Sequence, residues 1–284
     1  MNKAQRLNIV GATIGLGKRL QWPDNYFTLS QSISYQLYDL QDYPISTFTF
    51  SNGSSNNLAY NITLGRNSAG SNPVFPTYGS EFSIGAKLTI PYSLVNDKDY
   101  SNIDDQEKYR WLEYWKASFK GKWYTSITGD LVLMANTEFG FLGNYNDKLG
   151  DSPFERFFVG GDGMASYQLD GRETIALRGY ENGRLSSIDG GTIYNKFQME
   201  FRYPITLKPS ASIYVLGFLE AGNSYEGWGN FNPFELKRSA GFGLRIFMPA
   251  FGLLGIDFAH GFDPLPGQIE KSGWQTHFII GQQF

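Results

Sequence analysis

The sequence predicts an all-β fold, a transmembrane antiparallel β-barrel, and three observations support this prediction. Strand-like segments of about ten residues alternate with turn residues, and no helical period is sustained. Only 18% of the 284 residues are charged, compared with about 25% in soluble domains, whereas 17% are aromatic. No stretch approaches the roughly 18 consecutive apolar residues of a membrane-spanning helix, because Pro249, Gly252, Gly255 and Asp257 interrupt the closest one.

The opening residues, 1–17, are predicted to form a first strand. Lys3 and Arg6 before a mildly apolar run suggest a signal peptide, but Lys18 and Arg19 follow without a small-residue cleavage site. Along the rest of the chain we count about eleven strand candidates in one barrel domain, 1–284, with about six before a Gly-rich interval at 160–191 and five after it.

Apolar and polar residues alternate along the clearest strand candidates, at 27–38, 196–203, 238–248 and 254–259. A soluble β-sandwich alternates in the same way, so the pattern alone does not decide which face meets water. Tyrosine and tryptophan at segment ends are typical of the girdles at the two membrane interfaces and favour the membrane barrel: Trp22, Tyr26, Tyr35, Trp111, Trp115, Trp123, Tyr203 and Trp274.

Composition excludes several classes of function. The net charge is −3 with both signs interspersed, so no basic face is available for phosphates and no nucleic acid partner is expected. The chain has no cysteine, which excludes disulfides and thiolate metal sites, and we expect neither a metal nor a cofactor. Its two histidines, His260 and His277, have no Ser-His-Asp pattern near them, so we expect that the protein is not an enzyme.

Two glutamates are predicted to meet across neighbouring strands. The turn 206–210 joins the strand of Glu200 to that of Glu220, and counting from this turn places the two nearly opposite on one face, with about 5 Å between their Cβ atoms. Two like charges there require a cation, for which an arginine fork is best suited. The alternative is solvation by lumen water or pairing with Arg202.

A second pair is predicted by the same counting. About the turn 249–252, Arg245 and Asp257 face each other and can form a lumen ion pair.

The candidate cation for the two glutamates is Arg178, in the Gly-rich interval. Phe158-Val159-Gly160-Gly161 followed by Leu177-Arg178-Gly179-Tyr180 resembles the long sixth extracellular loop of the BamA family, whose Arg-Gly-Phe or Arg-Gly-Tyr tip folds back into the barrel. Glu200 and Glu220 fall where family members carry the acidic partners of that arginine. The resemblance implies a re-entrant loop, 160–191, with the tip motif Arg178, Gly179 and Tyr180.

The final strand carries two further features. Outward residues that end in a terminal aromatic resemble the β-signal of outer-membrane barrels, and Gly281 matches the glycine at which the last strand of the family kinks at the lateral gate. The seam residues so predicted are Phe278, Ile280, Gly281 and Phe284. The resemblance covers nearly the whole chain, and segments 15–20 and 90–94 look like members from the Bacteroidetes. A family barrel has sixteen strands, so we expect a C-terminal portion, truncated at its N-terminus.

The resemblance implies a function without covalent chemistry. The family inserts and assembles β-barrel proteins in the Gram-negative outer membrane, by lateral opening of the seam and strand templating there. The implied partners are unfolded outer-membrane proteins, accessory lipoproteins of the assembly complex, and outer-membrane lipid with lipopolysaccharide. Alternatives are a barrel of the same superfamily that secretes a polypeptide or assembles autotransporters, and a passive outer-membrane channel.

Overall fold

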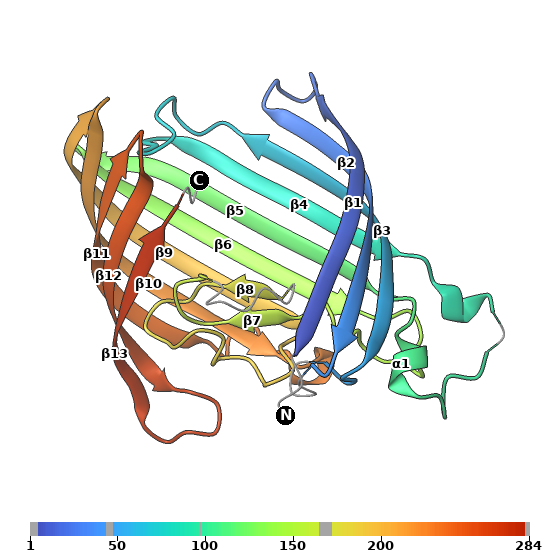
Figure 1. Ribbon diagram of the computed structural model, residues 1–284. Helices are drawn as coiled ribbons and strands as arrows, with labels where there is room; N and C mark the ends of the chain where they lie inside the picture. The colour runs from blue at the N-terminus through green and yellow to red at the C-terminus, as the bar shows by residue number, and fades with distance from the viewer. Residues whose placement is uncertain (1–4, 44–47, 97, 165–171, 282–284) are drawn as a thin grey trace.

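The described part of the chain forms one antiparallel sheet of eleven strands that neighbour one another in sequence order (Figure 1). The computed structural model describes residues 5–43, 48–96, 98–164 and 172–281. The eleven strands are β1 (Arg6–Arg19), β2 (Phe27–Gln41), β3 (Gly53–Asn67), β4 (Gly79–Thr89), β5 (Trp115–Thr128), β6 (Leu131–Gly143), β9 (Ile193–Lys208), β10 (Ala211–Tyr225), β11 (Lys237–Met248), β12 (Gly252–Pro264) and β13 (Lys271–Ile280). The predicted all-β fold with six strands before the long loop and five after it is confirmed.

Short elements lie in the connections. A parallel pair, β7 (Phe157–Val159) and β8 (Glu173–Ile175), lies in the long loop between β6 and β9. Other connections contain two 3-10 turns, η1 (Tyr92–Leu94) and η2 (Trp228–Asn230), and a single-turn helix, α1 (Asp105–Lys108). Within the described ranges, none of the helices has the length and apolar character needed to cross a membrane.

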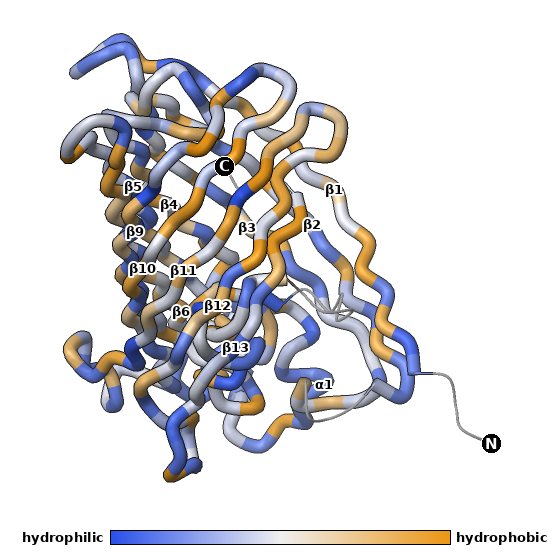
Figure 2. Tube along the Cα trace, turned by 90° about the vertical axis from the view of Figure 1, so that its left-hand side faces the viewer, coloured by the Kyte–Doolittle hydropathy of each residue, from blue (hydrophilic) through white to orange (hydrophobic). Residues whose placement is uncertain are grey.

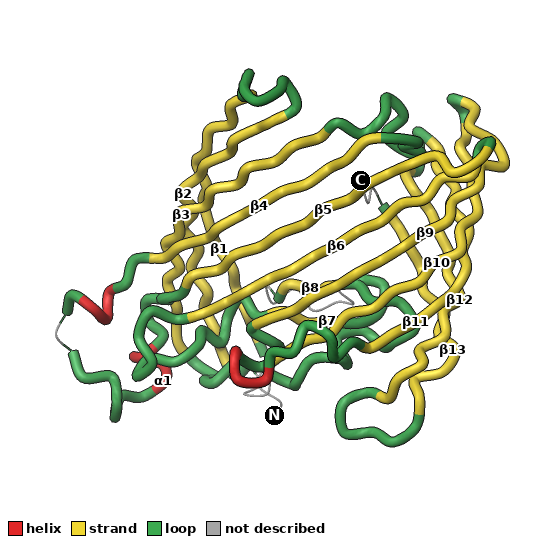
Figure 3. Tube along the Cα trace, turned by 180° about the vertical axis from the view of Figure 1, so that it is seen from behind, coloured by secondary structure: helices red, strands yellow, loops and turns green. Residues whose placement is uncertain are grey.

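The sheet curls so that its concave side encloses a lumen, and β1 and β13 form its two edges (Figures 1 and 3). Its strands contain 10 to 16 residues, enough to cross the hydrocarbon layer at a steep tilt. Among the described residues, no ladder joins β1 to β13.

Burial along the strands is inverted relative to a soluble sandwich. On β9, Met199 and Phe201 are 42% and 40% exposed, whereas the side chain of Glu200 between them is buried. A similar alternation of burial is clear along β6 and β10, and hydrophobic and hydrophilic residues succeed one another along the strands (Figure 2). Apolar side chains therefore face outward and charged ones face the lumen, as a membrane barrel requires.

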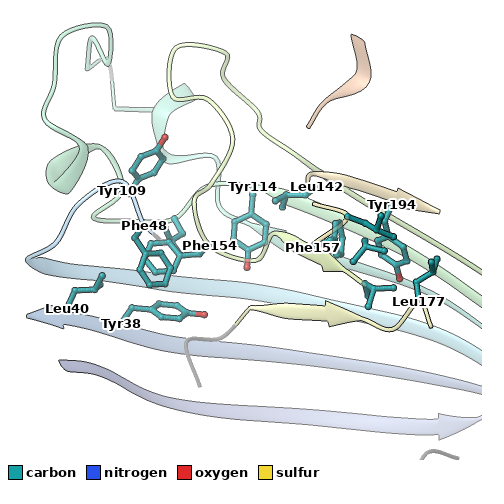
Figure 4. Packing of buried hydrophobic residues seen from close by; sticks show 14 of the residues in the cluster. Tyr38, Leu40, Phe48, Tyr109, Tyr114, Leu142, Phe154, Phe157, Leu177 and Tyr194 are labelled. Carbon is teal, nitrogen blue, oxygen red and sulfur yellow. The ribbon is translucent and has the colours of Figure 1, made fainter. Parts of the chain in front are cut away.

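The connections differ at the two ends of the sheet. At the turn end, two-residue or three-residue turns such as 209–210 and 249–251 join neighbouring strands. At the loop end, the connection 144–192 enters the lumen with β7 and β8 (Figure 1). Its aromatic and aliphatic residues pack with the loop-end residues of β2 and β9 in one buried cluster that includes Tyr38, Phe154 and Tyr194 (Figure 4).

The β3–β4 connection, 68–78, is longer than these turns, and part of it folds back into the lumen. The ring of Phe75 is 1% exposed and lies 5.2 Å, centroid to centroid, from the ring of Tyr214 on β10 in an edge-to-face contact. Val132 on β6 and Leu216 on β10 complete the apolar contact. A cavity of about 430 Å³ remains between this connection and the wall. The connection therefore narrows the lumen from the end opposite the long loop.

We expect Phe75→Ala to destabilise the barrel by about 3 kcal/mol, because truncation leaves a cavity under Tyr214. The measurement is the free energy of unfolding in urea, with the protein in lipid vesicles. Phe251→Ala is the matched control, since Phe251 lies in another turn-end connection and is 71% exposed. The control is expected to change stability by less than about 0.5 kcal/mol. Equal effects of the two substitutions would contradict the packing role of Phe75.

Candidate functional site

The long loop is held in shape by backbone pairing on either side of its undescribed part, 165–171. Gly161 and Leu177 exchange two hydrogen bonds of 3.0 Å, and the Gly160 N–H donates to the carbonyl of Ile175 at 2.9 Å. Gly161 has φ +78°, and a Cβ there would lie 1.5 Å from Oδ1 of Asn182. Only glycine fits such a position. The pairing places Arg178, the next residue after Leu177, at the wall of the lumen.

Arg178 touches three carboxylates from three strands. Its Nε and Nη2 donate to Oε1 of Glu220 on β10 at 2.8 and 2.6 Å, and its backbone N–H donates to Oε2 of Glu220 at 2.7 Å. Nη2 also donates to Oε1 of Glu200 on β9 at 2.7 Å, and Nη1 donates to Oδ2 of Asp257 on β12 at 2.9 Å. The guanidinium thus joins the loop to β9, β10 and β12.

Two further arginines complete the set of charges. Nε and Nη2 of Arg202 lie 2.8 and 2.7 Å from Oε2 of Glu200, and Arg245 makes a two-pronged contact with Asp257 at 2.6 and 2.8 Å. Three guanidinium groups therefore face three carboxylates. Such a balance is required where charges leave bulk water, because an unpaired buried charge is strongly destabilising.

Stacking and charge both favour the cationic form of Arg178. Its guanidinium carbon lies 3.5 Å from the centroid of the Phe218 ring on β10. Burial alone lowers the pKa of Arg178, but the charges of Glu220, Glu200 and Asp257 outweigh burial and raise the pKa above its ordinary value.

The other residues of the tip motif also contact the wall. Gly179 has φ +88°, and its N–H donates to Nε2 of His277 on β13 at 2.8 Å. A Cβ at Gly179 would lie 2.8 Å from the Cβ of Ser239, and one at Gly261 would lie 2.3 Å from the Gly179 carbonyl oxygen. Tyr180 is fully buried, and its hydroxyl donates to the carbonyl of Arg238 at 2.7 Å. The tip therefore meets β11, β12 and β13 with no spare room.

The two glutamates, predicted to lie nearly opposite each other, are offset by two residues along the ladder. The register shifts between Ile213 and Tyr214, and beyond that irregularity Glu200 lies opposite Phe218 while Glu220 lies opposite Gln198. The acids share a face but are diagonal neighbours rather than nearly opposite residues. Arg178 bridges this diagonal, and the alternative partner Arg202 binds Glu200 as well.

Arg245 and Asp257 are also diagonal rather than directly opposite. Arg245 lies opposite Gly255, and Asp257 lies opposite Gly243. A Cβ at Gly243 would lie 1.7 Å from Oδ1 of Asp257, and one at Gly255 would lie 2.8 Å from Cδ of Arg245. The two glycines therefore leave the space through which the predicted pair meets.

Sequence reasoning missed two members of the site. The sequence predicts only Arg245 as a partner of Asp257, and it predicts no lumen contact for His277. Both face the lumen and lie opposite each other in the β12–β13 ladder, so counting across that hairpin would have linked them. Within the described part of the chain, no group of three or more His, Cys, Asp or Glu residues could hold a metal ion.

The predicted seam residues lie at the end of β13. Phe278 and Ile280 are 52% and 69% exposed and point outward. Gly281 follows the strand with φ +114°, and its N–H donates to the carbonyl of Leu253 at 2.9 Å. Phe284 lies outside the described residues.

Comparison with known families decides the assignment. A family model described as the Omp85 superfamily domain matches residues 2–284. This chain belongs to the Omp85 superfamily. A search of curated protein sequences finds no match to this Omp85 chain.

Solved structures support the same fold. The Omp85 chain is similar to BamA from Haemophilus ducreyi lacking POTRA domains 1-3, with a TM-score of 0.68 and 17% identity, over 97% of this chain and 54% of that chain. It is similar to CdiB from Escherichia coli with a TM-score of 0.59 and 9% identity, over 96% of this chain and 45% of that chain. The chain thus spans about half the length of these two structures.

Membership of the Omp85 superfamily has direct consequences. The chain is an outer-membrane β-barrel protein, as predicted from its alternating strands. Proteins of this superfamily have no enzymatic activity, which confirms the expectation that the chain is not an enzyme. The comparisons do not support the expected Bacteroidetes-like lineage.

We expect Gly243→Ala to destabilise this Omp85 barrel by about 1–3 kcal/mol, because the added methyl group displaces the Asp257 carboxylate. Gly217→Ala on β10 is the matched control, since the nearest atom to a Cβ there is 3.9 Å away. The measurement is urea unfolding in lipid vesicles. If the two substitutions changed the free energy of unfolding equally, the Arg245–Asp257 pair would not depend on the space at Gly243.

Proposed function

We propose that this chain is the barrel part of a BamA-type assembly factor, which inserts and assembles β-barrel proteins in the outer membrane. The observation that carries the proposal is the buried contact of Arg178 with Glu200, Glu220 and Asp257. This contact fixes a long loop inside the lumen. The loop then lies inside the lumen, and the strand edges are the surface on which client proteins would be assembled.

Lateral opening supplies the mechanism. Strand edges in lipid carry unpaired backbone N–H and C=O groups, each of which costs several kcal/mol, so an open edge readily pairs with an incoming strand. We infer that β13 contributes one side of such a seam and that Gly281 weakens it, because its positive φ turns the backbone out of the strand direction. Client strands would add to this edge by β-augmentation.

The remaining assignments follow from this mechanism. We infer that residues 1–284 act as one barrel domain and that 160–191 is its re-entrant loop. The partners are unfolded outer-membrane proteins as substrates, accessory lipoproteins of the assembly complex, and outer-membrane lipid with lipopolysaccharide at the outward apolar face.

Secretion of a polypeptide, assembly of autotransporters and passive conduction are the rival functions. Secretion and conduction need a path through the lumen. Here the long loop enters the lumen from one end and Phe75 enters it from the other. A large, steady conductance of the full-length protein in planar bilayers would favour these rivals over the assembly factor.

We expect Arg178→Ala in the full-length protein to impair assembly of client barrels strongly, because three carboxylates lose their shared cation. Arg178→Lys is expected to restore little activity, since an ammonium cannot reproduce the planar fork. Arg184→Ala is the matched control, because its side chain lies in the same loop and is 58% exposed. The measurement is the yield of folded client barrel in proteoliposomes. Normal yield with Arg178→Ala would contradict the bracing role.

We expect Gly281→Ala to reduce the same yield more than Gly273→Ala does. Both glycines belong to the β13 region, have positive φ (+114° and +74°), and would place a Cβ in open space. Alanine is disfavoured at both positions, so Gly273→Ala controls for positive φ in general, and Gly281 differs from it in its larger φ and in its position at the end of the strand. Equal losses would show that strain alone, and not a seam, explains the effect of Gly281→Ala.

A further inference from the structure

The long loop contacts the wall at a second place, near its beginning. Phe154 packs its ring against those of Phe48 and Tyr38, with centroid distances of 4.5 and 4.6 Å (Figure 4). The next residue, Glu155, has φ +68°, which non-glycine residues adopt only where their surroundings hold them there. The wall thus fixes the chain at this point before the loop reaches its tip.

Glu155 binds two lysines of the wall. Its Oε1 lies 2.5 Å from Nζ of Lys87 on β4, and its Oε2 lies 3.3 Å from Nζ of Lys116 on β5. Lys116 also donates to the backbone carbonyl of Glu155 at 2.9 Å. The side chain of Glu155 is only 13% exposed and that of Lys116 only 8%, so water screens the contact weakly.

Lys116 links the beginning of the loop to the segment just before its tip. Its Nζ lies 2.6 Å from Oε2 of Glu173 on β8, and it lies 4.6 Å from the centroid of the Phe157 ring on β7. The two strands of the loop are paired with each other, with Phe157 opposite Glu173. One wall lysine therefore holds both strands of the loop.

The charges at the two contacts have opposite signs. At the tip, a loop cation, Arg178, meets wall acids on β9, β10 and β12. At the base, a loop anion, Glu155, meets wall cations on β4 and β5. The loop thus connects two separate parts of the curled sheet, and neither contact can substitute for the other.

We propose that Glu155, with Lys87 and Lys116, is a second positioning site for the long loop, which makes the loop a strut between the β4–β5 wall and the β9–β12 wall. This inference deepens the proposed function, because that function rests on the position of the same loop. It assigns Glu155 a role that the tip motif alone does not supply.

Electrostatics are consistent with a permanent ion pair. Burial alone raises the pKa of Glu155, but the charges of Lys116 and Lys87 outweigh burial and lower the pKa below its ordinary value. The carboxylate is therefore ionised at neutral pH. Removing it leaves Lys87 without this carboxylate and Lys116 with Glu173 alone, while the two lysines still lie opposite each other on β4 and β5 in a partly buried place.

Hydrogen-deuterium exchange of the purified full-length protein tests the strut. Glu155→Gln is expected to speed amide exchange in segment 152–160 by about tenfold or more, because local opening there becomes easier. Glu107→Gln is the matched control, since Glu107 forms a 2.7 Å pair with Lys98 but both side chains are exposed. The control is expected to leave exchange in segment 152–160 unchanged.

A triple variant, Lys87→Met with Lys116→Met and Glu155→Met, distinguishes the effect of unpaired charges from a general disturbance of the packing. We expect it to exchange more slowly in segment 152–160 than Glu155→Gln does, because both lysines are gone and the carboxylate that loses Lys116, Glu173, is 37% exposed and stays hydrated. Unchanged exchange in Glu155→Gln would overturn the proposal. So would a triple variant that exchanges faster than the single one.

This test does not depend on assembly activity. Exchange is measured on the barrel itself, so a protein that fails to insert clients can still show the expected difference in exchange between Glu155→Gln and the control. Conversely, an active protein with unchanged exchange in Glu155→Gln would leave the proposed function intact and refute the second positioning site alone.

Discussion

The pairing of lumen charges is the interaction on which the rest of this structure depends. Arg178, Arg202 and Arg245 face Glu200, Glu220 and Asp257, and every member of this set has a partner of opposite sign. These side chains border a cavity of about 330 Å³ but are themselves mostly buried, so each needs a partner of opposite charge, and each strand must keep the register that places its own charged residue there. The loop conformation and the strand register are therefore specified together.

Glycine is the second requirement of this arrangement. The diagonal contact of Arg245 with Asp257 uses the space left by the residues directly opposite them, which are glycines and have no side chains. Glycine in a strand normally weakens it. Here the loss of stability is offset by the ion pairs, because they connect the side chains of strands that are already paired through their backbones.

The sequence predicted much of the sheet and part of the site. Alternation has a period of two and is a local property, so the strands and their outward faces could be predicted from residues such as Met199 and Phe201. The offset of Glu200 from Glu220 could not, because a register irregularity near Tyr214 leaves no mark in the alternation. The insertion of Phe75 and the contact of Glu155 with Lys87 join residues far apart in the chain, and no periodicity reports such contacts.

The close approach of Gly179 and Gly261 has a consequence for how such chains diverge. Because the Gly179 carbonyl oxygen occupies the place where a side chain at 261 would begin, neither residue can acquire a methyl group while the tip stays at its present depth. A homologue with a larger residue at either position must hold its loop tip farther from β12. The residues at these two positions therefore indicate, in any related sequence, how closely the loop tip approaches β12.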